Sequence, residues 1–271
     1  MIVKYWGVRG SIPCPGPSTL RYGGETACVS VEIGNNLIVL DAGTGIKKLG
    51  QYAAATSMDI YCLISHLHMD HIRGFPFFDP LYQTDRTVTL IPLVLDGTPH
   101  YPTVIMDGVY FPRKWEDLPA NIVMADIAAD DYFGRLGFEV NTFPVNHPGD
   151  AVGFSIESEA KKFVHVPDNE IDRTSDKFSI LVQAIDNADV LSHDAQWVND
   201  DLPMKEGWGH SSVTELCDLA VELEIKNLVL FHHDPDRTDD ELDVIGRSAT
   251  ERLHASGINC SVAFEGMNIT I

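Results

Sequence analysis

The sequence predicts an α/β fold of four layers, in which two mixed β-sheets face each other and helices cover their outer sides. Short apolar runs rich in β-branched and aromatic residues occur along the whole chain, which is typical of strands. The early runs follow one another closely, as in antiparallel meanders, whereas the later runs alternate with helical patterns. Such sheets bury one face against each other and the other face against helices, which gives layers of α, β, β and α.

Strands are expected where residues of high β propensity are bounded by turn residues. These runs are Ile2–Trp6, Cys28–Ile33, Leu37–Leu40, Ile60–Ile64, Val88–Leu95, Phe138–Phe143, Val152–Ile156, Phe163–Val166, Val190–Leu191, Leu228–Phe231 and Ile258–Phe264. Two helices are also clearly marked. One begins at Ser212, which is followed three residues later by Glu215 as in a capping box. The other begins near Thr238 and stops at Gly257.

A chain of 271 residues can bury one large core, so we interpret residues 1–271 as a single domain. Segment 96–120 fits neither the strand nor the helix pattern, and it combines several prolines with aromatic residues. Two interpretations stay open for it. It is either a packed surface loop or an inserted lid over a functional site, because long ordered loops are often functional.

The formal net charge is −21, from 19 Lys and Arg against 40 Asp and Glu. Binding of a long nucleic acid depends on phosphate neutralisation by basic side chains, so such a partner is disfavoured. No run approaches the roughly 18 apolar residues of a membrane helix, and the start of the chain has no signal-peptide pattern. The five cysteines are scattered and form no C-x-x-C pair. We therefore expect a cytoplasmic protein with free thiols and no membrane partner.

The most informative segment is Ser65-His66-Leu67-His68-Met69-Asp70-His71, which directly follows a predicted strand. At strand-like spacing, the side chains of His66 and His68 point the same way. Asp70 and His71 lie where the chain turns into a helix, so they can serve a second centre. Imidazoles and carboxylates are the ligands that borderline divalent metals prefer, and the spacing therefore predicts a metal site.

Four ligands in one turn cannot fill two coordination spheres, so other ligands must come from distant segments. Candidates follow or close later apolar runs: His147, Asp168, His210, and the pair His232 and His233. One such histidine alone is more often structural. Several at successive strand ends favour a site built from the loops at one edge of the sheets.

The pattern H-x-H-x-D-H, followed by distant His, Asp and His, resembles the metallo-β-lactamase superfamily. Within it, the chain is most similar to the phosphodiesterase branch around the tRNA-processing endonuclease RNase Z, cyclic-nucleotide phosphodiesterases and the cyclic phosphodiesterase of the phosphonate pathway. Leu191–Ala195 is similar to the "HEAT" segment of RNase Z with Asp for Glu, and His210–Ser212 is similar to its "HST" segment. The resemblance runs nearly end to end and implies the four-layer αββα sandwich of this family.

The resemblance also implies two divalent metal ions and their ligands. One ion takes His66, His68 and His147, the other takes Asp70, His71 and His232, and Asp168 bridges them. His233 is the alternative to His232, which the flanking Leu230 and Pro235 favour. Imidazole-rich sites suit Zn²⁺, with Mn²⁺ or Fe as alternatives that similar ligands hold.

His210 is assigned as the group that stabilises the transition-state charge or protonates the leaving oxygen. Asp194 is expected to accept a hydrogen bond from the other ring nitrogen and to fix the tautomer. Asp70 is assigned both as a ligand and as a catalytic residue, and Asp41 as a brace for the loops of the site. The remaining histidines are interpreted as surface, packing or supporting residues: His100, His165, His193 and His254.

We predict a dinuclear metal-dependent hydrolase that cleaves a small phosphodiester such as a cyclic nucleotide. Acyl, thioester or lactone hydrolysis is the alternative within the same superfamily, and a non-catalytic nucleic-acid-binding role is a third class that the intact ligand set opposes. His68 stands where the oxygen-reducing diiron relatives carry Glu, which disfavours redox chemistry. RNase Z proteins bind tRNA through an extra basic arm, and this sequence has no basic insertion. A homodimer is compatible with the sequence.

Overall fold

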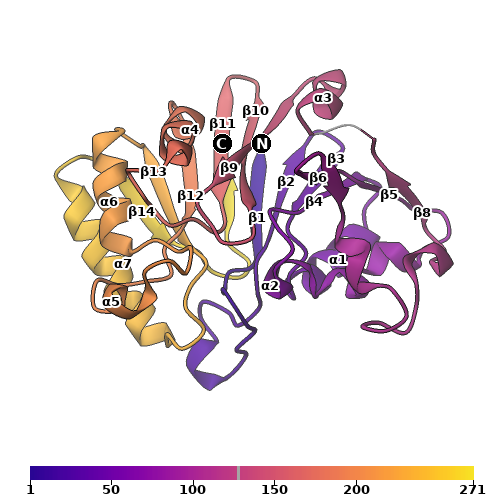
Figure 1. The fold of residues 1–271 in the computed structure, drawn as a ribbon, viewed down its shortest axis with the longest axis horizontal. Helices are drawn as coiled ribbons and strands as arrows, with labels where there is room; N and C mark the ends of the chain where they lie inside the picture. The colour runs from indigo at the N-terminus through magenta and orange to yellow at the C-terminus, as the bar shows by residue number, and fades with distance from the viewer. Residues whose placement is uncertain (127–128) are drawn as a thin grey trace.

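The computed structural model describes residues 1–126 and 129–271, and two large β-sheets pack face to face at its centre (Figure 1). The first sheet has seven strands in the spatial order β15-β1-β2-β3-β4-β5-β8. They are β15 (Asn268–Thr270), β1 (Ile2–Gly7), β2 (Cys28–Ile33), β3 (Asn36–Leu40), β4 (Asp59–Leu63), β5 (Thr87–Leu90) and β8 (Asn121–Met124).

The second sheet has six strands in the order β14-β13-β12-β11-β10-β9. They are β14 (Asn259–Val262), β13 (Asn227–Phe231), β12 (Val190–Asp194), β11 (Lys161–Val166), β10 (Ala151–Ser158) and β9 (Glu139–Val145). Strands β9, β10 and β11 pair antiparallel, and β11 to β14 pair parallel. The parallel pairs follow from the crossover helices α4 (Asp176–Ile185), α6 (Val213–Glu222) and α7 (Asp239–His254).

The first sheet departs from the expected meander after its third strand. Strands β1, β2 and β3 are antiparallel neighbours, as predicted, but β3, β4, β5 and β8 run parallel. The meander expectation is wrong there because helix α1 (Ile46–Ala54), which we did not predict, carries the chain from β3 back to the start of β4. Parallel neighbours need such a crossover.

Alternate residues of each strand feed different cores, because successive side chains point to opposite faces. In β3, Ile38 and Leu40 lie in the core between the sheets, whereas Leu37 and Val39 pack with α1. The outer face of the second sheet packs with α4, α6 and α7 in the same way. Figure 1 shows α1 on one side of the molecule and α6 and α7 on the other. The predicted αββα arrangement is confirmed.

Several elements differ from the runs that the sequence predicts. The run Val88–Leu95 is divided into β5 and β6 (Leu93–Leu95) at Pro92, which has no N–H for a ladder hydrogen bond. The short strands β8 and β15 carry too few residues to be recognised, and the helix α4 was also not predicted.

Segment 96–120 has a packed base and an exposed tip. It contains β7 (Thr98–His100), which pairs with β6, and two 3₁₀ turns at Pro102–Ile105 and Trp115–Asp117. Ile105 and Leu118 are buried in the core around α1, whereas Val109 and Tyr110 at the tip are 84% and 80% exposed. The segment is therefore anchored at both ends and projects aromatic residues from its middle.

Both predicted helix starts are confirmed. Ser212 Oγ accepts a hydrogen bond from Glu215 N at 3.2 Å, and the Glu215 carboxylate accepts one from Ser212 N. Thr238 caps α7 with the same reciprocal pair. The five cysteines are free thiols. Among the described residues, no helix is long and apolar enough to cross a membrane.

Replacing Ser212 with Ala should lower the free energy of unfolding by about 1 kcal/mol, the usual cost of losing a helix N-cap. Urea denaturation followed by circular dichroism measures it. Ser256→Ala, at an exposed position, is the matched control and should change stability by less than about 0.5 kcal/mol. Equal effects of the two substitutions would show that the cap contributes nothing.

Candidate metal centre

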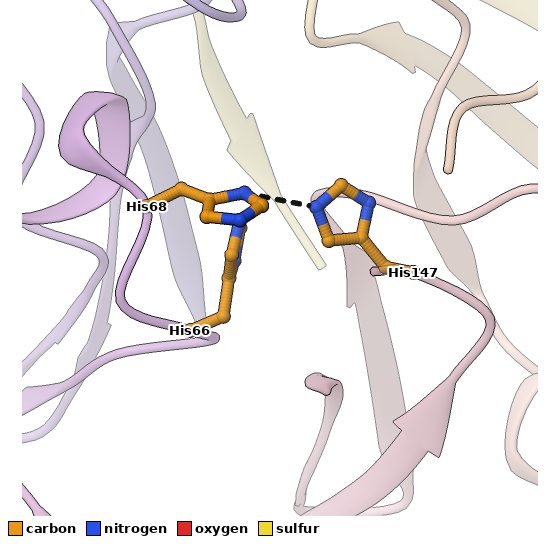
Figure 2. A group of neighbouring side chains, drawn as sticks. All are labelled: His66, His68 and His147. Atoms are coloured by element: carbon orange, nitrogen blue, oxygen red, sulfur yellow. Dashed lines mark hydrogen bonds between the residues drawn. The ribbon is translucent and has the colours of Figure 1, made fainter. Parts of the chain in front are cut away.

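Three imidazoles meet where the two sheets come together. His66 and His68 lie on the loop that leaves β4, and His147 follows β9. Figure 2 shows the three rings converging from opposite sides of a common point, with His68 Nδ1 and His147 Nε2 3.0 Å apart. One nitrogen from each ring lies within 4.8 Å of the others. The arrangement fits three ligands of one cation.

A second group of ligand atoms lies beside the first. Asp70 and His71 occupy the short helix α2 (Met69–Ile72), Asp168 follows β11, and His232 follows β13. One ligand atom from each of these four buried residues lies within 4.8 Å of the others. The first sheet and the loop after it supply two of these residues, and the second sheet supplies the other two.

The carboxylate of Asp168 faces both groups. Its Oδ1 lies 3.1 Å from Nε2 of His71 and 3.1 Å from Nε2 of His232. Its Oδ2 lies 3.7 Å from Nε2 of His66 and 3.7 Å from Nε2 of His147. Asp168 is 1% exposed. Its Oδ1 therefore faces the second group and its Oδ2 the first, with Nδ1 of His210 a further 3.9 Å neighbour of Oδ2.

The donor atoms fit a divalent cation. Nε2 of His66, Nε2 of His71 and Oδ1 of Asp168 are buried and have no hydrogen-bond partner among the described residues. A buried polar atom without a partner costs about 1–3 kcal/mol. A cation bound between these three atoms would satisfy all of them. Burial alone lowers the pKa of His71, but Asp168, Asp70 and Asp41 outweigh it and raise that pKa well above its ordinary value. The same negative potential favours a metal cation.

Hydrogen bonds on the far side of the rings set their orientation. His71 Nδ1 donates to Asp41 at 2.8 Å, His147 Nδ1 donates to the Gly209 carbonyl at 2.9 Å, and His232 Nδ1 donates to Gln196 Oε1 at 3.2 Å. Each ring therefore presents Nε2 to the cluster, which is the usual role of such partners in metal sites. The bracing role expected of Asp41 agrees with this geometry. Gln196 and the Gly209 carbonyl were missed, since no sequence pattern marks them.

Gly209 is required by close packing. Its φ is +88°, and a Cβ there would lie 2.2 Å from Nδ1 of His147. The carbonyl that Gly209 contributes holds His147 in place. Any side chain at Gly209 would displace that ring.

His232 and His233 point in opposite directions. His232 Nε2 lies 3.3 Å from Asp70 Oδ2, in the second group. His233 Nε2 donates to the Ala263 carbonyl at 2.8 Å, and its ring packs edge-on against Tyr22. The structure therefore brings His232, and not His233, to the cluster.

His210 and Asp194 form a buried pair at the side of the cluster. His210 Nδ1 donates to Asp194 Oδ2 at 2.8 Å, and the carboxylate also accepts from the backbone N–H groups of Asn169 and Gln196, each at 3.0 Å. Burial lowers the pKa of His210, but Asp194 more than offsets this and raises it to about 9. The His210 ring lies 5.0 Å from that of His232. The pair matches the expected geometry of a held, cationic imidazole.

The other histidines lie outside both groups. His165 is buried against Phe231, with Nδ1 3.1 Å from Ser192 Oγ, and His193 bonds the carbonyl of Asp194. His100 is half-buried and His254 is exposed. A cavity of about 1000 Å³ opens beside His147 and His210, which are among its lining residues.

Comparison with known proteins shows the family. The model of the beta-lactamase superfamily domain matches residues 36–233. Ribonuclease Z from Thermoplasma acidophilum is 23% identical to this chain in an alignment of 288 positions. The alignment covers 88% of this chain and 87% of the relative. The structure of human tRNase Z, short form, superposes with a TM-score of 0.67 at 20% identity and covers 100% of this chain and 99% of the other.

A diphosphatase from the PhnP family superposes with a TM-score of 0.70 at 16% identity, over 100% of this chain and 97% of the other. Such structural likeness shows the fold, and the domain match shows the family. In this chain, the loops after the strands carry the His and Asp clusters that fit a divalent metal. The chain therefore belongs to the beta-lactamase superfamily, and it is a metal-dependent hydrolase of the metallo-β-lactamase fold.

Proposed function

We propose that this chain hydrolyses a small phosphodiester at a centre of two divalent ions. One ion is held by His66, His68 and His147, and the other by Asp70, His71 and His232. Asp168 serves both, and its two oxygens, directed to separate groups, are the observation that carries the proposal. Zn²⁺ suits this imidazole-rich set best, and Mn²⁺ or Fe are the alternatives.

When bound, two divalent ions supply Lewis acidity to a phosphoryl oxygen and lower the pKa of water at the same site. The residues of the chain provide the geometry. Asp194 engages Nδ1 of His210, which leaves Nε2 for the substrate. From the cavity wall, this nitrogen donates a proton to the leaving alkoxide or stabilises its charge. The segments that carry His210 and Asp194 resemble those of the phosphodiesterase branch. This favours hydrolysis of a phosphodiester over hydrolysis of an acyl ester, thioester or lactone.

Charge supports a small substrate. The chain carries a net charge of −21, and the cavity beside His210 is lined by the acidic residues Glu170, Asp172, Glu206 and Glu215. The cationic side chain of Arg173 there is bound to Glu222 at 2.7 Å. Relatives carry the names ribonuclease Z and tRNase Z, which point to RNA. The acidic cavity opposes a polyanion, and a diester of nucleotide size brings far less charge.

Metal analysis should find about two equivalents per chain in protein purified without chelators and loaded with Zn²⁺. Asp168→Ala should lose at least one equivalent, because the missing carboxylate serves both groups. His254→Ala, at an exposed position outside the clusters, should keep both. A wild-type content near zero after careful loading would end the metal proposal.

His210→Ala should lower kcat by about 10²–10⁴-fold, the usual loss for a general acid, while both metals stay bound. The loss should be smaller for diesters with a p-nitrophenolate leaving group, because this group needs little protonation. Kinetics on two diesters with different leaving groups, together with metal analysis, measure this. Asp194→Asn should reproduce part of the defect by releasing the ring.

Two results would contradict the role of His210. Loss of a metal equivalent in His210→Ala would make the residue a ligand. Unchanged turnover of every diester would remove it from catalysis.

Nucleotide-sized diesters should be hydrolysed with a higher kcat/KM than a tRNA precursor or a long single strand, because the negative field repels polyanions. Parallel assays at physiological salt measure the ratio. Raising the salt concentration should lower this ratio, since screening weakens the repulsion between the acidic protein and a polyanion. Efficient cleavage of structured RNA at physiological salt would overturn the small-substrate proposal.

A further inference from the structure

A second cavity lies beside α2, the short helix that carries the proposed ligands Asp70 and His71. We call it the aromatic cavity, and it has a volume of about 630 Å³. Its lining includes Met69, Arg73, Phe77, Tyr110 and Phe111. Met69 lies in sequence between two of the proposed ligands, His68 and Asp70, and is 48% exposed. The wall of the aromatic cavity is thus continuous with the ligand loop.

The walls are aromatic side chains that the fold leaves open. Phe77 follows α2 and is 54% exposed, and Tyr110 at the tip of segment 96–120 is 80% exposed. Phe111 packs edge-on against Phe77, with ring centroids 5.7 Å apart. Exposed apolar clusters on a soluble protein mark binding sites. Two separate segments of the chain supply these rings at one place.

The aromatic cavity also has a different charge from the cavity beside His210. Glu25, Lys47 and Lys48 line it, and the two lysines are bound to Asp79 and Glu265. The backbone N–H of Arg73 donates to the Met69 carbonyl, but its guanidinium has no hydrogen bond or ion pair with any residue that the structure describes. A guanidinium stacks on flat rings and binds anions. A free guanidinium next to open aromatic rings therefore favours a planar ligand that carries hydrogen-bond acceptors.

The two cavities lie on different sides of the ligand loops. His210 lines the cavity that also contains Leu202 and Pro203 of α5 (Leu202–Lys205), whereas Met69 of α2 lines the aromatic cavity. Figure 1 shows α5 and α2 in separate parts of the molecule. A diester has two ester groups. If one leaves next to His210, the other is directed towards the Met69 side.

We infer that the aromatic cavity binds the ester group that stays on phosphorus, and that this group carries an aromatic ring, as a nucleoside does. The inference rests on the proposed phosphodiesterase function. Phe77, Tyr110 and Phe111 contact the ring, and the Arg73 guanidinium donates hydrogen bonds to carbonyl oxygens on it. In the reaction, water adds to phosphorus and the bond to the leaving oxygen breaks. The products are a phosphate monoester, held in the aromatic cavity, and an alcohol released next to His210.

Two substrates with the same leaving group test the inference: thymidine 5′-(p-nitrophenyl phosphate) and methyl p-nitrophenyl phosphate. Only the retained group differs, so chemistry at the leaving oxygen is matched. The wild-type enzyme should prefer the thymidine ester in kcat/KM. Tyr110→Ala and Phe77→Ala should each reduce this preference by about tenfold, the effect of losing one base-stacking contact, mostly through KM. Arg73→Gln should also reduce it.

Val109→Ala is the matched control, because Val109 is 84% exposed on the same tip but does not line the aromatic cavity. It should leave the preference unchanged. If the wild-type enzyme hydrolyses neither ester, the phosphodiesterase proposal itself fails. If the wild-type enzyme hydrolyses both esters without a preference, only the aromatic-cavity inference fails. The same holds if Tyr110→Ala lowers kcat/KM for the two esters by the same factor.

The same variants exclude a different occupant. Sedimentation of the wild-type protein and of Tyr110→Ala should give the same molecular mass. A wild-type dimer that Tyr110→Ala converts to a monomer, with the substrate preference unaltered, would show that a second copy of the chain covers the rings and would overturn the inference.

Discussion

The carboxylate of Asp168 is the point on which the rest of the site depends. It is buried at the end of β11, and its oxygens face four imidazoles: His66 and His71 from the segment after β4, His147 from the loop after β9, and His232 from the loop after β13. A buried negative charge without compensation is strongly unfavourable. Burial raises the pKa of Asp168, but His232, His71 and His66 outweigh it and hold the pKa well below its ordinary value. The carboxylate therefore stays ionised and attracts cations to a place where water is scarce.

The arrangement of the two sheets brings the ends of several strands to one edge. β4 delivers the ligand loop of the first sheet, while β9, β11 and β13 deliver His147, Asp168 and His232 from the second. The core between the sheets fixes these ends relative to one another, because a close-packed interior is hard to compress. Behind each ring a hydrogen-bond partner sets the tautomer, as Asp41 does for His71. Rigid strands and bonded rings together make a site that is formed before the substrate arrives.

The surroundings of the centre are not symmetrical. One side holds the His210–Asp194 pair and an acidic cavity, and the other holds open aromatic rings with a free guanidinium. A symmetric metal cluster cannot by itself distinguish the two ester groups of a diester. In the proposed reaction, the difference between the two cavities supplies that distinction, since we assign proton donation to one side and stacking to the other.

The amino-acid sequence by itself determined the α/β class, the two capped helices and the metal-ligand motif, because these follow from local periodicity and spacing. His66, His68, Asp70 and His71 stand within one turn of chain, and hydroxyl–glutamate pairs mark Ser212 and Thr238. Tertiary structure decided what depends on contacts between distant segments. It turned His232 inward and His233 outward, gave Gln196 and the Gly209 carbonyl their orienting roles, and set β3 and β4 parallel. It also joined Phe77 to Phe111 across the 96–120 segment. Neighbouring residues have the same local preferences in either orientation, so only the packing of the whole chain distinguishes them.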